Sequence, residues 1–197
     1  MSLQDRYGNQ LGTQSVAARD AYLAGVDSLM AATPGMDAAF QKSVEADENF
    51  ALGHISLARA KQLLGRGHEA KAPLARAKEL AGGASPREQS QIAIFEKILT
   101  GQGAAALEAI REHMKEWPRD AMALAPATSV FGLIGFSGRL GREREQTEFL
   151  APLAPHYEDD GWFAAHHAHA LIEDGKSAQA RLWLEKSATL TPRSPWM

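Results

Sequence analysis

The sequence predicts an all-α fold, and three observations lead to this prediction. Alanine occurs 36 times, whereas valine and isoleucine together occur 11 times, and this imbalance favours helix over strand. Glycine, proline and short polar residues interrupt the chain at intervals that suit helices of three to four turns. One spacing of small and larger residues also recurs with a period near 34 residues, which fits two antiparallel helices and their turns.

The recurring unit begins with a small or turn residue, and its starts are 34, 36, 40 and 34 residues apart, at Ala31, Gly65, Gly101, Gly141 and Gly175. Within a unit, marked positions follow at intervals of five, four, three and five residues, and the last is a helix stop. Intervals of four and three keep residues on one helical face, so small residues let two helices approach and larger ones fill the groove beside them. The fourth unit fits the spacing most loosely.

Capping residues set the expected helix boundaries. Ser85-Pro86-Arg87-Glu88 predicts a helix start, with serine as N-cap, proline at the first helical position and glutamate three residues after the cap. Asn49, Asp120 and Asp160 are expected to cap three other helices. No segment predicts a strand. The ten expected helices are 15–32, 37–47, 50–64, 68–81, 86–100, 103–117, 120–137, 142–156, 160–173 and 177–190.

The chain shows no internal linker, so residues 15–197 are predicted to form a single repeat domain. Residues 1–14 are polar and weakly patterned, and we expect them to form a weakly ordered N-terminal extension. Residues 191–196 look like the step into a further helical hairpin, which would leave the last helix without a polar cap. Either this helix packs against something else, or the chain is the N-terminal part of a longer protein.

Composition excludes several classes of protein. The 197 residues contain no cysteine, which excludes disulfide frameworks, cysteine-ligated metal sites and thiol nucleophiles. A formal net charge of −3 argues against a nucleic-acid partner. No run approaches the ~20 apolar residues of a membrane span, and the start does not resemble a secretion signal. We therefore expect a cytoplasmic protein with no membrane or nucleic-acid partner.

Residues from about 15 to 194 resemble the tetratricopeptide repeat. The segment 40–52, Phe-Gln-Lys-Ser-Val-Glu-Ala-Asp-Glu-Asn-Phe-Ala-Leu, looks like the junction between two such repeats, with Glu48 where the family usually has proline. The segment 65–70, Gly-Arg-Gly-His-Glu-Ala, looks like the turn inside a repeat. More narrowly, segments 5–13 and 118–121 resemble the tetratricopeptide repeat protein 38 family, whose members are longer than this chain.

The resemblance implies a right-handed α-α superhelical solenoid of about five helical hairpins. Its concave groove would be lined by the first helix of each repeat and would hold a peptide or a partner helix. The positions that bind chaperone C-termini in some family members are occupied here by Ala21, Gly25, Ile55 and Arg59, so that clamp is absent.

Superposing the repeats predicts the groove residues. Arg59, Gln62, Gln91 and His169 are expected to orient the partner. The full predicted set is Arg59, Gln62, Gln91, Phe95, Trp162, His169 and Glu173. The alternative is that the apolar members, such as Phe95, pack on neighbouring helices, because an error of one residue in phase turns groove into core.

A second hypothesis starts from the histidine-rich segment 162–173. On a helix, His166, His169 and Glu173 share one face, and two imidazoles with a carboxylate could hold zinc or serve acid–base chemistry. The metalloprotease motif is absent, because it needs two histidines four apart with a glutamate after the first. Packing or groove lining is the competing interpretation of these residues, and His167 is expected to face the core.

Glycines and apolar residues are concentrated in segment 131–138. The glycines of segment 132–138 are not followed by Lys-Ser/Thr or preceded by a strand, so a nucleotide loop is not predicted. Segment 131–136 is the most apolar run of the chain and is expected to be buried. No Gly-x-Ser-x-Gly pattern frames any serine.

The leading hypothesis is a non-catalytic scaffold, without a cofactor, that binds a protein or peptide. The second is a metal-dependent protein or enzyme using His166, His169 and Glu173. The third is a homodimer formed through the uncapped C-terminal end.

Overall fold

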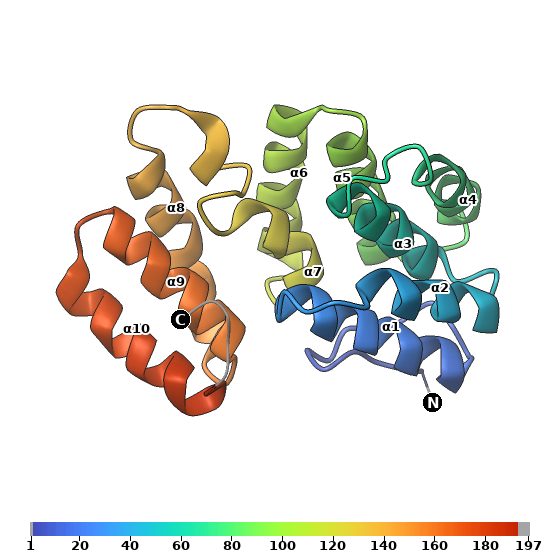
Figure 1. Ribbon diagram of the computed structural model, residues 1–197, viewed down its shortest axis with the longest axis horizontal. Coiled ribbons are helices and arrows are strands. Elements are labelled where there is room, and N and C mark those ends of the chain that lie inside the picture. The colour runs from blue at the N-terminus through green and yellow to red at the C-terminus, as the bar shows by residue number, and fades with distance from the viewer. Residues whose placement is uncertain (1, 193–197) are drawn as a thin grey trace. The chain divides into compact units, whose positions relative to one another are not determined.

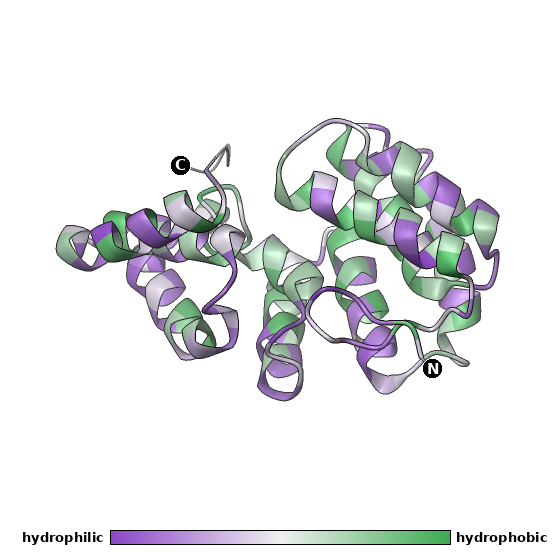
Figure 2. Ribbon diagram, turned by 90° about the horizontal axis from the view of Figure 1, so that it is seen from below, coloured by the Kyte–Doolittle hydropathy of each residue, from purple (hydrophilic) through white to green (hydrophobic). Residues whose placement is uncertain are grey.

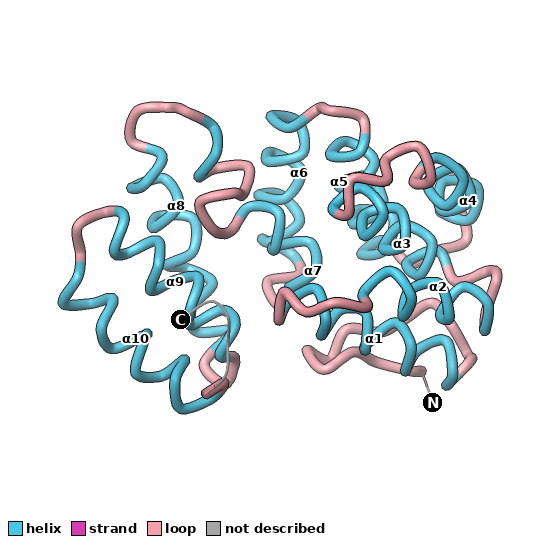
Figure 3. Tube along the Cα trace, in the orientation of Figure 1, coloured by secondary structure: helices cyan, strands magenta, loops and turns pink. Residues whose placement is uncertain are grey.

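The computed structural model describes residues 2–192, and this part of the chain is all-helical, with ten α-helices and no strand (Figure 3). No helix in it is long and apolar enough to span a membrane. The chain divides into two compact units, residues 1–123 and 124–197, although the sequence predicts a single domain. The helices are α1 (Val16–Met30), α2 (Met36–Ala46), α3 (Ala51–Leu63), α4 (Lys71–Ala81), α5 (Pro86–Leu99), α6 (Gly103–Glu116), α7 (Ala121–Leu124), α8 (Arg142–Leu150), α9 (Gly161–Glu173) and α10 (Ser177–Leu190).

The helices of the first unit pack in chain order. Each of α1 to α5 contacts the helix that follows it, and α3 also contacts α1 and α5 (Figure 1). Polar and apolar residues alternate around the helices, as expected when each helix buries one face (Figure 2). Aromatic rings fill the space between the first three helices. The ring centroid of Tyr22 lies 5.8 Å from that of Phe40 and 5.3 Å from that of Phe50. Fully buried Ile94, Phe95 and Ile110 continue the core towards α6.

The second unit is built around α9, which packs against α8 on one side and α10 on the other. Ten of its residues are buried, so this helix is covered on most of its surface. Phe163 stacks on Tyr157 with ring centroids 4.5 Å apart and meets the edge of Trp183 at 6.2 Å. The aromatic side chains therefore join α9 to its neighbours on both sides.

The same turn ends four helices. After α3, the amide of Gly65 donates to the carbonyl of Gln62, and the amide of Arg66 donates to that of Lys61. Equivalent pairs of bonds follow α1, α5 and α9, with Ala32, Gly101 and Gly175 in the place of Gly65. This is the Schellman motif, which needs a left-handed residue and therefore favours glycine. The φ angles are +73°, +78° and +74° at the three glycines and +49° at Ala32.

Most of the predicted helix starts are confirmed. Ser85 and Glu88 form a reciprocal capping box at α5. Asp160 caps α9 by accepting from the amide of Phe163 at 2.7 Å, and Asp120 caps α7 by accepting from that of Ala123 at 3.2 Å. The prediction for Asn49 is wrong, because Phe50 occupies the N-cap of α3 and no side chain caps that helix.

The seventh helix is much shorter than predicted. The range 120–137 contains α7 followed by two short 3₁₀ turns and a loop. Pro126 has no backbone N–H to donate to a helix, and Ser129 adopts a left-handed conformation with φ of +65°. A smaller difference affects the eighth helix, which ends at Leu150 and continues as 3₁₀ turns through two prolines to Tyr157.

The apolar segment 131–136 is only partly buried, so that prediction is wrong. Ile134 is fully buried, but Phe131 and Phe136 are 81% and 79% exposed. The backbone explains the difference. A Cβ on Gly132 would lie 2.1 Å from the carbonyl oxygen of Thr128, so the glycine backbones, and not the phenylalanine rings, form the tight contacts of this loop.

The N-terminal segment, residues 2–14, is ordered and packed, in contrast to the expected weakly ordered extension. Tyr7, Leu11 and Thr13 are buried. The segment folds back on itself, because the amide of Leu11 donates to the carbonyl of Leu3 and that of Asp5 to the carbonyl of Asn9. The polar composition of the segment does not indicate this order, because the residues that it contacts lie far along the chain.

Candidate functional site

The predicted groove residues of the first unit fall into two kinds. Arg59 and Gln62 lie half-buried on α3, and the Arg59 guanidinium donates to the Gln62 amide oxygen at 2.5 Å. Gln91 and Phe95 on α5 are buried, at 0% and 1% exposure. Helix α5 contacts α3, α4 and α6, so the face that was expected to line a groove is covered by neighbouring helices.

The predicted residues of the second unit all lie on α9. Trp162 is buried, His169 is half-buried and Glu173 is exposed. His166 is buried, its ring lies tilted against that of Trp162 with ring centroids 4.7 Å apart, and its Nδ1 donates to the Trp162 carbonyl at 2.9 Å. Within residues 2–192, no group of three or more His, Asp or Glu side chains is arranged to hold a metal ion. His167 is buried beside Phe163 and Trp183, as expected of a residue facing the core.

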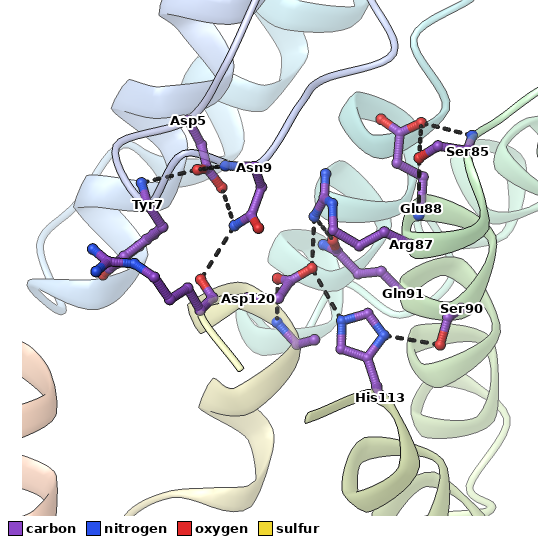
Figure 4. Close-up of polar contacts among 12 residues, drawn as sticks. Asp5, Tyr7, Asn9, Ser85, Arg87, Glu88, Ser90, Gln91, His113 and Asp120 are labelled. Atoms are coloured by element: carbon purple, nitrogen blue, oxygen red, sulfur yellow. Dashed lines mark hydrogen bonds and ion pairs between the residues drawn. The ribbon is translucent and has the colours of Figure 1, made fainter. Parts of the chain in front are cut away.

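The most connected polar group of the first unit surrounds Asp120 (Figure 4). The Oδ2 atom of Asp120 accepts from the Arg87 guanidinium at 2.6 Å and from His113 Nε2 at 3.1 Å. His113 Nδ1 lies 2.8 Å from Ser90 Oγ, and the Arg87 guanidinium also contacts Gln91. We call these five residues the Asp120 cluster. It joins α5, α6 and the start of α7.

Burial sets the electrostatics of the Asp120 cluster. Arg87 is 7% exposed, and His113 and Asp120 are 1% exposed. Burial acts to raise the pKa of Asp120, but the hydrogen bond from His113 and the charge of Arg87 outweigh it and hold the pKa below its usual range. The carboxylate therefore stays ionised inside the unit, and both charges of the pair are satisfied.

Ser90, His113 and Asp120 follow the order of a hydrolase relay. The tautomer with its proton on Nε2 would donate to Asp120 and accept from the Ser90 hydroxyl. Two features oppose this chemistry. Arg87 shares the Asp120 oxygen that contacts His113, so it offsets the charge that would stabilise an imidazolium. Ser90 lies inside α5, where backbone amides are committed to helix bonds and cannot form an oxyanion hole. The geometry favours a structural role for the cluster.

The N-terminal segment contacts the end of α2 and the starts of α5 and α7. The Thr13 hydroxyl donates to Asp47, the C-cap of α2, and the amide of Gly12 donates to Glu88 of α5 at 2.7 Å. Arg87 donates to the carbonyl of Gln10 at 2.7 Å, and Asn9 donates to that of Arg119 just before α7. The segment thus covers one side of the Asp120 cluster.

A cleft of about 360 Å³ lies beside this segment, in the size range of sites that hold a small molecule or a side chain. Apolar and hydrogen-bonding groups both face it. Its walls come from the N-terminal segment, the start of α3, the end of α4 and the start of α5. The lining residues are Gln10, Leu11, Gly12, Asn49, Ala51, Leu80, Gly83, Ala84, Ser85 and Glu88.

Sequence reasoning missed both the Asp120 cluster and the cleft. Arg87 and Asp120 were recognised only as parts of helix starts, and they are 33 residues apart. One signal was present. His113 stands at the repeat position where Ser43, Ala77 and Ser187 stand in other units, and a larger polar residue in a buried place needs a partner.

A comparison with models of protein families found no match to this chain, and a comparison with curated proteins found none either.

Proposed function

We propose that this protein is a tetratricopeptide-type helical scaffold that binds a segment of another protein and catalyses no reaction. The order of helix contacts in the first unit supports the proposal. The first helices of successive hairpins, α1, α3 and α5, contact one another, and each also packs against its own second helix. Stacked hairpins that contact only near neighbours are the usual plan of such repeats.

Contacts that recur at equivalent positions also support it. The Schellman turns after α1, α3, α5 and α9 stand near the starts of four of the five sequence units. In the first helical hairpin, the Ser43 hydroxyl of α2 donates to the carbonyl of Ala18 in α1 at 2.8 Å. In the last helical hairpin, the Ser187 hydroxyl of α10 donates to the carbonyl of Gly161 in α9 at 2.9 Å. The same small residue thus ties the second helix of a hairpin to the first helix at both ends of the chain.

The observation that carries the binding function is the cleft beside the N-terminal segment. Leu11, Ala51 and Leu80 provide an apolar lining, while Asn49 and Ser85 provide polar groups at the same place. An apolar socket with a few polar groups suits the insertion of one side chain from an extended peptide. Glu88 is already bonded to Gly12 and Ser85, so it shapes the wall of the cleft.

Selection from a phage-displayed library of random 12-residue peptides tests the proposal. The wild-type protein should enrich a shared peptide pattern with an apolar residue. The variant Ala84→Trp places an indole in the cleft and should lose capture of those peptides by at least tenfold. The control Ala178→Trp adds the same ring to an exposed position on α10 and should capture them normally.

The proposal would be refuted by a wild-type protein that enriches no peptide family. Enriched peptides that bind Ala84→Trp as tightly as wild type would place the binding site elsewhere on the molecule.

A further inference from the structure

Arg59 is a charged side chain that forms no ion pair among residues 2–192. It lies half-buried on α3, and its hydrogen bond goes to a neutral partner, the amide of Gln62. Within residues 2–192, no carboxylate forms an ion pair with it. A guanidinium has five N–H donors in a planar fork, so most of its capacity for hydrogen bonds is left to water or to a ligand.

Among residues 2–192, no carboxylate counters the effect of burial on Arg59. Burial alone lowers the pKa of Arg59 to about 10, and no nearby charge opposes that effect. The group is still charged at neutral pH, so the folded protein holds a partly dehydrated cation, which costs stability. By contrast, Arg66 of the same unit, which is also half-buried, forms ion pairs with both Asp37 and Glu69.

The residues around Arg59 on α3 suit a ligand. Leu63 lies one turn after Arg59 and is 48% exposed. Positions three and four residues apart share one helical face. Arg59, Gln62 and Leu63 therefore present a cation, an amide and an apolar side chain together. We call these three residues the Arg59 face.

We propose that the Arg59 face binds an acidic residue of the partner peptide. A glutamate or aspartate carboxylate pairs with the Arg59 guanidinium, and an adjacent apolar side chain of the peptide packs on Leu63. Charge complementarity selects this occupant, because the face offers a cation without its own counter-ion. The inference depends on the proposed function, since it defines the chemistry of the peptide that the first unit binds.

The same 12-residue library tests the preference when it is selected against charge variants. Wild type should enrich peptides with Asp or Glu at a fixed position beside an apolar residue. Arg59→Met should lose the acidic preference, and Arg59→Glu should replace it with Lys or Arg. The control Arg181→Met removes an exposed arginine of α10 that already pairs with Glu185, and it should keep the wild-type pattern. Thermal melts show that each variant is folded.

A second measurement uses the wild-type protein alone and two capped tripeptides. The Nε–Hε NMR signal of Arg59, identified by its loss in Arg59→Met, should shift saturably with acetyl-Leu-Glu-Leu-amide. Acetyl-Leu-Gln-Leu-amide should bind roughly tenfold more weakly, which is about the effect of one charge-assisted hydrogen bond.

The outcomes separate the two proposals. Library peptides that lack an acidic preference and bind Arg59→Met equally well would overturn the Arg59 face and leave the scaffold proposal standing. A shift with the glutamate tripeptide but no selected peptides would support the Arg59 face and refute binding at the cleft. No shift and no selected peptides would refute both.

Discussion

The two units bury polar groups in different ways. The first unit buries Arg87, His113 and Asp120 as a network in which opposite charges are paired. The second buries His166 and His167 on α9, and burial lowers the pKa of each to about 4, so both are neutral at pH 7. The first unit thus buries charged side chains that are paired with each other, whereas the second unit buries histidines in their neutral form. The units should therefore respond differently to mutation and to acid.

The largest expected effect comes from breaking the Asp120 cluster. Asp120→Ala leaves Arg87 buried without its carboxylate and removes the cap of α7, so it should lower the free energy of unfolding of the first unit by about 3–5 kcal/mol. Hydrogen exchange should show faster exchange in α5 and α6, with α9 and α10 unchanged.

The double variant Arg87→Met/Asp120→Ala is the matched control, because it removes both charges. It should recover part of the lost stability. A loss below about 1 kcal/mol for Asp120→Ala alone would show that the pair contributes little, and the contrast between the units would fail.

The second effect is a loss of stability in the second unit on acidification. Unfolded histidines take up protons below pH 6.5, whereas folded His166 and His167 do so only near pH 4. Unfolding therefore takes up protons between these values, and the free energy of unfolding should fall as the pH drops from 6.5 to 4, by about 1–2 kcal/mol per histidine at pH 5.5.

Hydrogen exchange of α9 and α10 at pH values from 7 to 4.5, corrected for intrinsic rates, measures this effect. His167→Gln should reduce the pH dependence by about half. The low pKa of Asp120 keeps its contribution to the first unit intact until the pH falls below about 4. Equal acid sensitivity in both units would contradict the assignment.

The smallest effect concerns a turn that the units share. The left-handed position is Gly175 in the second unit but Ala32 after α1 in the first. Because a Cβ is strained in this conformation, Ala32→Gly should stabilise the first unit by roughly 1 kcal/mol. Gly65→Ala at the same place in the next turn should destabilise it by a similar amount. Urea unfolding of both variants checks the pair, and a change of the same sign in both would be inconsistent with this reasoning.

Local chemistry explains what the sequence could predict. The capping box at Ser85 and the turn at Gly65 depend on neighbouring residues, and both are confirmed. The prediction of the seventh helix is wrong beyond Leu124, because Pro126 lacks the backbone N–H that would continue the helix. Most of its predicted length, including the apolar run around Ile134, became turns and loop.

The candidate site was less predictable because its contacts join distant residues. Arg59 was selected from the repeat spacing, and only the structure shows that it has no carboxylate partner among residues 2–192. Gln91 and Phe95 were selected in the same way but are buried, since three helices surround α5. The walls of the cleft come from four segments, and no local pattern links Leu11 to Leu80.

The contacts of the N-terminal segment affect the order in which the first unit folds during synthesis. Gln10 and Gly12 bond to residues 77 and 76 positions later, and Asn9 to one 110 positions later. During synthesis, residues 9–12 leave the ribosome before these partners, so they must wait until α5 and α6 have emerged before they reach their final places. Hairpins of a repeat can fold one after another, but this unit is completed only when its beginning meets its end.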